Sequence, residues 1–467
     1  MAFAVLLVPL IAAGLALLPI AGVSRAAAIA AGLVIASLGG MLAAGLGGPT
    51  PIFEWAGPLA RFQLGTDGFG ATLISLGGVL FAVGAAFSRR TPHARAYFSL
   101  WCLLQAAVAG VFLARDLVLF FVFWEAMLVP LALLMWLWGS SDARPATLRF
   151  LVYTMAGSAL LLTGIVSVIV VQGTSDIARL AARPLAEPTQ ALLALFFLAA
   201  FVVKLPLFPF HAWLPRAYLA APLPVTILLS GIVAKTAAYA VIRICFPLFP
   251  AGMARLAPAL VALAAIGVLY GALLATRQQD TRRLVAYASL SHLNLIALGV
   301  FTGTAAATQG ALVASVSHGL EVAALFLLLG MLAQRVGGWS VAGAGGVALS
   351  APVLAAFATL AVVVTIGVPG TSGFAGELLV LAAGYARFPG ATAVAAIVVV
   401  FSAMYGLHFL RRVFHGPPLV TVRDLGLGER LLVAPLLIAA LVIGVAPGIV
   451  SDRVPAPPPG RAEVLGE

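Results

Sequence analysis

Long apolar runs recur along the whole chain and restrict its fold more than any other feature. Runs of 18 or more residues with few charges follow one another from the N-terminus to about residue 450, and no polar stretch between them is long enough for a domain. Each run is long enough to cross a bilayer, which takes about 20 residues. Strands of about ten residues with alternating polarity, the signature of a membrane barrel, are absent. With 63% hydrophobic and 9% charged residues, the chain is predicted to be an all-α polytopic membrane protein, and a soluble enzyme is excluded.

We expect about 14 transmembrane helices. The predicted ranges are 2–22, 26–47, 68–88, 96–114, 117–139, 149–172, 189–210, 224–248, 255–276, 284–302, 307–333, 351–381, 390–410 and 430–450. The first run resembles a signal peptide in length. A basic segment does not precede it and a second apolar run follows at once, so a retained first helix is favoured.

The arginines indicate the orientation. Fifteen of the 24 lie in loops that follow odd-numbered helices, and nine lie on the opposite side. The positive-inside rule places the fifteen in the cytoplasm and, because the helix count is even, both termini on the outer side. The formal charge of +11 is therefore explained by topology, and no nucleic-acid partner is expected. The proline-rich residues 455–459 predict a loose C-terminal tail.

The two cysteines exclude several kinds of site. Cys102 and Cys245 both lie inside apolar runs without CxxC spacing. A disulfide framework, a thiolate-bound iron–sulfur cluster and a structural zinc site are therefore excluded. No cofactor is expected in this chain.

Both lysines of the chain lie inside predicted membrane helices. Lys204 and Lys235 occupy costly positions, whereas every basic loop residue apart from histidine is arginine. A desolvated lysine can release its proton and an arginine cannot, so this choice indicates proton transfer. The alternative is a lysine that snorkels to the interface or forms a static ion pair.

Three glutamates have the same placement. Glu125, Glu321 and Glu377 lie in apolar segments, and such residues commonly mark proton or ion paths. We expect Glu125 to pair with Lys204, so that withdrawal of the carboxylate lets the proton leave. A purely structural salt bridge is the alternative.

Histidines complete the predicted relay. His292 and His318 fall in mid-helix, and His318 shares a helix face with Glu321, three residues away. A role in packing alone is the alternative for each. The remaining histidines are weaker candidates: His93 and His415 in basic loops, His211 after a proline-rich break, and His408 near the interface.

Two predicted helices are interrupted near a buried charge. Pro206 and Pro209 follow Lys204 in the seventh, and a Gly/Pro-rich stretch (Gly367, Pro369, Gly370, Gly373) precedes Glu377 in the twelfth. Helices four to eight and nine to thirteen each have their fourth member broken, which indicates two inverted five-helix repeats. The predicted parts are helices 1–3 (1–95), the first repeat (96–248), the second repeat (249–412), and the last helix with its tail (413–467).

Five segments resemble a known family. FFVFWEAMLVPLALL, VKLPLFPFHAWLPRAY, RRLVAYASLSHL, SHGLEVAALFLLLGML and GVPGTSGFAGELLVL are similar to the antiporter-like membrane subunits of bacterial respiratory complex I, and also to subunits of multisubunit cation/proton antiporters and membrane-bound hydrogenases. The resemblance covers roughly helices four to thirteen. Glu377 favours the M-type chains, because L- and N-type chains carry lysine there, and the long lateral helix of L-type chains is also missing.

The resemblance implies roles for the buried residues. Glu125 and Lys204 would be the ion pair of a first half-channel and Lys235 the central relay. His292 and His318 would connect Lys235 to Glu377, the terminal group of the second half-channel. Glu321 departs from the family, which usually has a small or hydroxyl residue there. It adds a proton site or anchors His318 or an arginine, and the sequence leaves both open.

Three functions follow as hypotheses. The first is a proton-translocating, non-redox membrane subunit of a bacterial inner-membrane NADH:quinone oxidoreductase. Its partners would be L- and N-type chains, and NADH, FMN, iron–sulfur clusters and quinone would be bound in other subunits. The second is a subunit of a cation/proton antiporter or hydrogenase-type complex. The third, a stand-alone transporter of an organic solute, fits worst, because the charges are spread over five helices.

Overall fold

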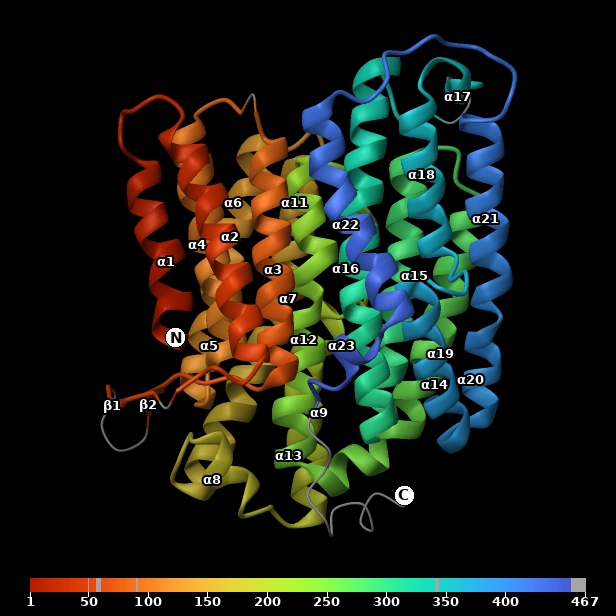
Figure 1. The fold of residues 1–467 in the computed structure, drawn as a ribbon. Coiled ribbons are helices and arrows are strands. Elements are labelled where there is room, and N and C mark those ends of the chain that lie inside the picture. The colour runs from red at the N-terminus through yellow and green to blue at the C-terminus, as the bar shows by residue number, and fades with distance from the viewer. Residues whose placement is uncertain (49, 56–59, 90, 341–343, 455–467) are drawn as a thin grey trace. The chain divides into compact units, whose positions relative to one another are not determined.

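The computed structural model describes residues 1–48, 50–55, 60–89, 91–340 and 344–454. Helices make up most of this part of the chain (Figure 1). The helices are α1 (Ala2–Ala16), α2 (Val23–Ala43), α3 (Gly68–Phe87), α4 (Ala94–Leu113), α5 (Leu117–Ala126), α6 (Leu128–Trp138), α7 (Ala143–Gln172), α8 (Ile177–Ala181), α9 (Glu187–Lys204), α10 (Leu214–Ala220), α11 (Leu223–Leu228), α12 (Ala234–Ala240), α13 (Phe246–Leu248), α14 (Pro250–Thr276), α15 (Thr281–Thr302), α16 (Ala305–Val336), α17 (Val347–Ser350), α18 (Pro352–Thr365), α19 (Ser372–Arg387), α20 (Pro389–Ala396), α21 (Val398–Val413), α22 (Leu427–Val445) and α23 (Gly448–Ser451).

A short hairpin and two π-helical segments complete the described elements. Strands β1 (Ile52–Glu54) and β2 (Arg61–Gln63) pair antiparallel, with Phe53 opposite Phe62. The π-helices η1 (Leu229–Val233) and η2 (Val241–Cys245) lie on either side of α12. The stretch from α11 to α13 is therefore one continuous helix with two wide turns.

The helix count agrees with the prediction. Twelve helical stretches of the described residues are long and apolar enough to cross a membrane, and the shorter apolar helices α1 and α18 lie where the first and twelfth spans are predicted. An all-α polytopic membrane protein of about 14 helices is thus confirmed. The inverted relation of the two helix sets stays a prediction, as does the loose tail, whose residues from 455 lie outside the described part.

Some predicted helix ends are wrong. The first helix ends at Ala16 rather than residue 22, and the seventh ends at Lys204 rather than residue 210. Pro19 and Pro206 explain these ends, because proline cannot donate a backbone hydrogen bond and disfavours helix in the residue before it. The twelfth predicted span is two helices, α18 and α19, separated by the Gly/Pro-rich stretch, and α19 continues to Arg387.

Aspartate and threonine side chains fix several helix starts. Asp116 accepts hydrogen bonds from the N–H groups of Val118 (2.9 Å) and Leu119 (3.1 Å) at the start of α5. Asp67, Asp280, Thr304 and Thr371 cap α3, α15, α16 and α19 in the same way. These caps satisfy N–H groups that the helix itself leaves without partners.

The chain divides into two compact units. The described residues of unit 1 lie within 1–206 and 220–260, together with 453 and 454, and those of unit 2 lie within 207–219 and 261–452. The four parts predicted from the sequence (1–95, 96–248, 249–412 and 413–467) are a separate division of the chain and remain a prediction.

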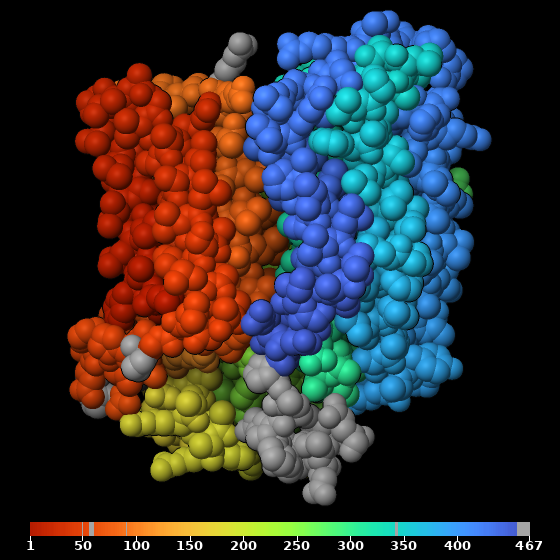
Figure 2. Space-filling model, viewed as in Figure 1, coloured from red at the N-terminus to blue at the C-terminus, as the bar shows by residue number. Residues whose placement is uncertain are grey.

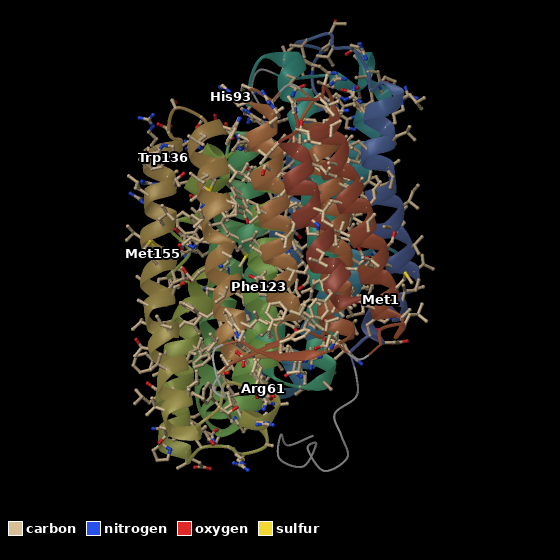
Figure 3. All side chains as sticks on the ribbon, turned by 90° about the vertical axis from the view of Figure 1, so that its left-hand side faces the viewer. Met1, Arg61, His93, Phe123, Trp136 and Met155 are labelled. Atoms are coloured by element: carbon tan, nitrogen blue, oxygen red, sulfur yellow. The ribbon has the colours of Figure 1, made fainter. Side chains whose placement is uncertain are left out.

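Unit 1 places α1, α2 and α3 side by side, as the red and orange helices of Figures 1 and 2 show. Small residues let α2 and α3 approach closely: a Cβ atom on Gly32 would lie 2.6 Å from the backbone nitrogen of Ala82. Such close approach is typical of membrane helices, where packing replaces the hydrophobic effect. On α7, apolar side chains such as Met155, which is 57% exposed, project outward (Figure 3). These are side chains that lipid or a neighbouring chain would cover.

The most deeply buried helices carry several of the ionisable residues. The α11–α13 stretch, with Lys235, is buried along its length within unit 1. In unit 2, α16 is buried in the same way and packs against α15, α18, α19 and α22. The fold therefore positions its candidate site away from lipid, as buried ionisable groups require.

Candidate functional site

Lys235 lies at the start of α12, between the two π-helices. Its side chain is fully buried, and its Nζ donates a hydrogen bond of 2.6 Å to the carbonyl oxygen of Ser230. Ser230 lies in η1, five residues before the lysine. The ammonium is therefore solvated by backbone, and wide π turns of this kind are frequent at functional sites.

Lys204 is the last residue of α9 and lies above an aromatic ring. Its Nζ is 3.6 Å from the ring centroid of Trp124 on α5, a cation–π contact. The indole N–H of Trp124 donates to the hydroxyl of Ser158 (3.2 Å), which fixes the ring. The helix C-terminus adds favourable carbonyl dipoles beside the positive charge.

Glu125 follows Trp124 and is half-buried. Among the ion pairs of the described residues, none joins Glu125 and Lys204 within 4.0 Å. The structure therefore does not contain the expected ion pair, and Trp124 is the direct contact of the lysine. Sequence reasoning missed Trp124, although its place beside Glu125 was a usable signal.

A second group forms where α15, α16 and α19 meet in unit 2. His292 Nδ1 lies 3.7 Å from Oε1 of Glu321 and 3.7 Å from Oε1 of Glu377. All three side chains are buried. One imidazole nitrogen therefore lies between two carboxylates from different helices.

His318 belongs to the same group. Its Nε2 makes a hydrogen bond with the hydroxyl of Ser289 (3.1 Å), and its ring centroid is 6.1 Å from that of His292. Both histidines and both glutamates line one small cavity of unit 2. The structure therefore brings His292, His318, Glu321 and Glu377 together.

The break between α18 and α19 brings the backbone close to the carboxylate of Glu377. Gly367, between α18 and α19, has a positive φ of 69°. A Cβ atom there would lie 2.5 Å from Oε2 of Glu377, so both the backbone conformation and the close carboxylate require glycine. Oε1 of Glu377 makes no hydrogen bond within the described part of the chain.

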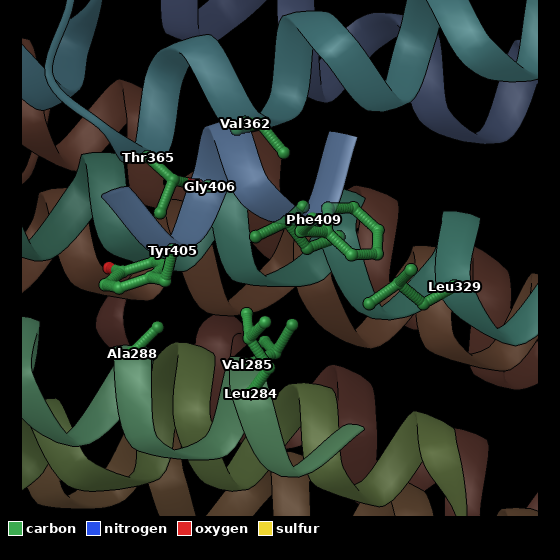
Figure 4. A pocket seen from close by; sticks show the side chains of 10 residues that line it. Leu284, Val285, Ala288, Leu329, Val362, Thr365, Tyr405, Gly406 and Phe409 are labelled. Atoms are coloured by element: carbon green, nitrogen blue, oxygen red, sulfur yellow. The ribbon is translucent and has the colours of Figure 1, made fainter. Parts of the chain in front are cut away.

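Tyr405 is a member of this group that the sequence analysis missed. Its hydroxyl lies 3.4 Å from His292 Nε2, and its ring lines a small adjoining apolar pocket with Leu284, Val362 and Phe409 (Figure 4). A phenol hydroxyl both donates and accepts, so it suits either form of the imidazole. Tyr405 stands among apolar residues of α21, and no spacing to a charged residue identified it.

The other histidines lie apart from both groups. His93, His408 and His415 are exposed. His211 is buried beside aromatic rings, 5.5 Å from that of Phe208 and 4.8 Å from that of Tyr270 between centroids. His211 therefore packs against aromatic rings within unit 2.

The candidate site residues thus form two groups, one in each unit. Lys204 and Lys235 lie on α9 and α12, which contact each other within unit 1, and the histidine–glutamate group lies in unit 2. Across the described residues, no set of three or more His, Cys, Asp or Glu side chains has the geometry to hold a metal ion. The arrangement buries lysine, histidine and glutamate, residue types that can exchange protons, in an apolar fold.

The chain is similar to known membrane proteins. Residues 114–404 match the family described as NADH:quinone oxidoreductase/Mrp antiporter, TM. The chain is 37% identical to NADH-quinone oxidoreductase subunit M of Pseudomonas aeruginosa, covering 86% of this chain and 82% of that one. It is 34% identical to subunit M of Escherichia coli K12, covering 84% and 80%.

A solved structure has the same fold. A chain of respiratory complex I from Thermus thermophilus with bound NADH superposes with a TM-score of 0.88 at 33% identity, covering 97% of each chain. The family match spans more than half of this chain, and the relatives cover most of it. The chain therefore belongs to the NADH:quinone oxidoreductase/Mrp antiporter family of membrane subunits.

Proposed function

We propose that this chain is the M-type subunit of a bacterial NADH:quinone oxidoreductase and that it moves protons across the membrane. The observation that carries the proposal is the buried contact of His292 with Glu321 and Glu377 in unit 2. Burial of ionisable groups inside a membrane costs free energy, and such groups commonly mark proton or ion paths in membrane proteins. The identity to subunit M of two bacteria supports the choice of complex.

Each buried residue has a proposed part in the transfer. Glu125 sets the charge state of Lys204 across the face of Trp124, so that movement of the carboxylate changes the affinity of the lysine for its proton. Lys235 is the central relay in unit 1. His292 and His318 connect to Glu377, the terminal acceptor in unit 2.

The redox chemistry belongs to partner chains. NADH, FMN, the iron–sulfur clusters and quinone are bound by other subunits, and this chain is a translocase subunit that carries out no electron transfer itself. L- and N-type membrane chains are the proposed neighbours. The arginine distribution supports a multi-pass chain with both termini on the outer side of the inner membrane.

The test replaces Glu377 by glutamine, which keeps the shape and removes the titratable group. In the assembled native complex, Glu377→Gln is expected to lower proton uptake per NADH oxidised in vesicles, because the terminal acceptor is lost. Glu187→Gln, an exposed position at the start of α9, is the matched control. Uptake at the control level in Glu377→Gln would contradict the proposal, and uptake that depends on added sodium or potassium would favour the cation/proton antiporter.

A further inference from the structure

Glu321 is the buried group whose role the proposed function leaves open. It lies on α16, is 3% exposed, and approaches His292 Nδ1 to the same distance as Glu377 does, 3.7 Å. The chain thus holds a second carboxylate at the point where the relay reaches its terminal acceptor.

His292, Glu321 and Glu377 form a trio of ionisable groups. Their charges make an arrangement with shared protons the most stable one. Two ionised carboxylates beside one imidazole would leave a net negative charge inside an apolar unit, even with the imidazole protonated. Like charges that share a buried site do not both ionise readily, and strongly coupled groups bind protons as one unit. An imidazolium on His292, with a proton on both ring nitrogens, and one proton shared by the glutamates make the trio neutral.

The two ring nitrogens of His292 face different groups. Nε2 faces the hydroxyl of Tyr405, whereas Nδ1 lies near both carboxylates, so the Nδ1 proton is the one that can be exchanged with them. The second neighbour of the trio is His318, whose Nε2 is bonded to Ser289. Oε1 of Glu377 makes no hydrogen bond within the described residues and lines the same small cavity as Glu321.

From this geometry we propose that Glu321 is a second proton-binding carboxylate, which passes its proton to Glu377 through His292. In the first step the Nδ1–H bond of the His292 imidazolium breaks and an O–H bond forms on Glu377, leaving a neutral imidazole beside two carboxylic acids. In the second step the carboxyl O–H bond of Glu321 breaks and an N–H bond forms at Nδ1, which restores the imidazolium, leaves Glu321 ionised and keeps the three groups neutral in sum. No electrons are exchanged, and the inference rests on the proposed proton-translocating function.

The contacts of 3.7 Å are longer than hydrogen bonds. Rotation of either carboxylate, or a water molecule in the cavity, closes the gap for each step, and proton-transfer contacts commonly tighten only during turnover. Because both contacts end on one nitrogen, only one carboxylate at a time can exchange a proton with it. The two proton transfers therefore occur one after the other.

The test compares two substitutions at one position in the assembled complex. Glu321→Gln keeps the size and hydrogen-bonding capacity but cannot carry a proton, whereas Glu321→Asp can. We expect Glu321→Gln to lower proton uptake roughly tenfold, less than the hundredfold or more of a sole proton-transfer group, because Glu377 remains. Glu321→Asp is expected to restore most of the uptake, and Glu187→Gln is the control.

A double variant separates a shared path from two independent effects. Glu321→Gln combined with Glu377→Gln is expected to pump no less than Glu377→Gln alone, because both residues serve one step. Uptake at the control level in Glu321→Gln would show that Glu321 only anchors its neighbours and would overturn this inference. The proposed function fails separately, if Glu377→Gln also pumps at the control level.

A measurement on the unmodified complex covers the case in which Glu321→Gln does not assemble. Dicyclohexylcarbodiimide is an apolar reagent that reacts with protonated carboxyl groups inside membranes, and peptide mass mapping identifies the modified residue. Modification at Glu321 is the expected result. A Glu321 that stays unmodified while Glu377 reacts is a permanent carboxylate, and the inference is then wrong.

Discussion

At the residue scale, the two lysines differ in what holds their charge. Lys204 lies on the face of Trp124 and within reach of the charge of Glu125, whereas the Nζ of Lys235 is bonded to a backbone carbonyl. An aromatic face and a carboxylate both accept guanidinium as well as ammonium. A backbone carbonyl at 2.6 Å, within a buried helix, fits the compact ammonium better.

Lys235→Arg is expected to impair turnover strongly, because guanidinium does not release its proton at any accessible pH. The measurement is proton uptake per NADH oxidised in vesicles, with assembly checked on native gels. Lys204→Arg is the matched comparison and should be milder, since part of its role is charge pairing. Normal pumping in Lys235→Arg would refute the relay role of Lys235, and equal losses in the two variants would contradict the expected order.

Lys204→Ala and Glu125→Gln are each expected to leave the chain inserted and to lower both pumping and the linked quinone reduction. Each substitution removes one charge of a pair that must separate during transfer. Trp124→Phe keeps an aromatic face under Lys204 and is expected to retain most of the activity. If either charge variant pumps at the wild-type rate in the assembled complex, the pair is structural.

At the element scale, helix α18 starts with a cap from a distant loop. Pro352 occupies its first turn, and Asp424 accepts hydrogen bonds from the N–H groups of Val353 (3.0 Å) and Leu354 (2.9 Å). Asp424 lies in the loop before α22, outside the membrane-spanning segments. The loop thus replaces the cap that Ala351, the residue before the helix, cannot provide.

Asp424→Ala is expected to destabilise unit 2 by about 1 kcal/mol, the usual contribution of an N-cap. Burial opposes ionisation of Asp424, but the N–H donors and Arg430 outweigh it and hold the pKa below its ordinary value of 3.8. The stabilisation is therefore present above about pH 4 and is lost as the pH falls through the lower folded pKa.

The measurement is thermal unfolding of the purified complex in detergent at neutral pH and below pH 4. Asp142→Ala is the control, because Asp142 precedes α7 without a side-chain cap bond. A difference between the two variants that persists unchanged at the lower pH would show that the carboxylate of Asp424 is not its cause.

At the scale of the whole molecule, the proposed orientation is open to direct labelling. The native Cys102 and Cys245 are buried, so they should not react with an impermeant maleimide. Ser141 and Ala186 are both exposed and lie in loops predicted to be on opposite sides. Ser141→Cys is expected to label only in inside-out vesicles, and Ala186→Cys only in right-side-out ones. The reverse pattern would place both termini in the cytoplasm.

The sequence by itself determined the fold class and the buried charges. Apolar runs of about 20 residues specify membrane helices because unpaired backbone groups cannot be left in lipid. Lys204, Lys235 and the three glutamates stood out because charge in such runs is rare and costly. The breaks beside Lys204 and Glu377 were equally readable, since proline and glycine act on the local backbone.

The tertiary structure alone decided which of these residues meet. Contacts between helices depend on packing and rotation about the helix axis, which the spacing within one helix does not contain. For this reason Trp124, rather than Glu125, is the direct contact of Lys204, and Tyr405 joins His292 from a helix without buried charges. The meeting of Glu321 and Glu377 on one nitrogen of His292 has the same origin, because it requires three helices to converge.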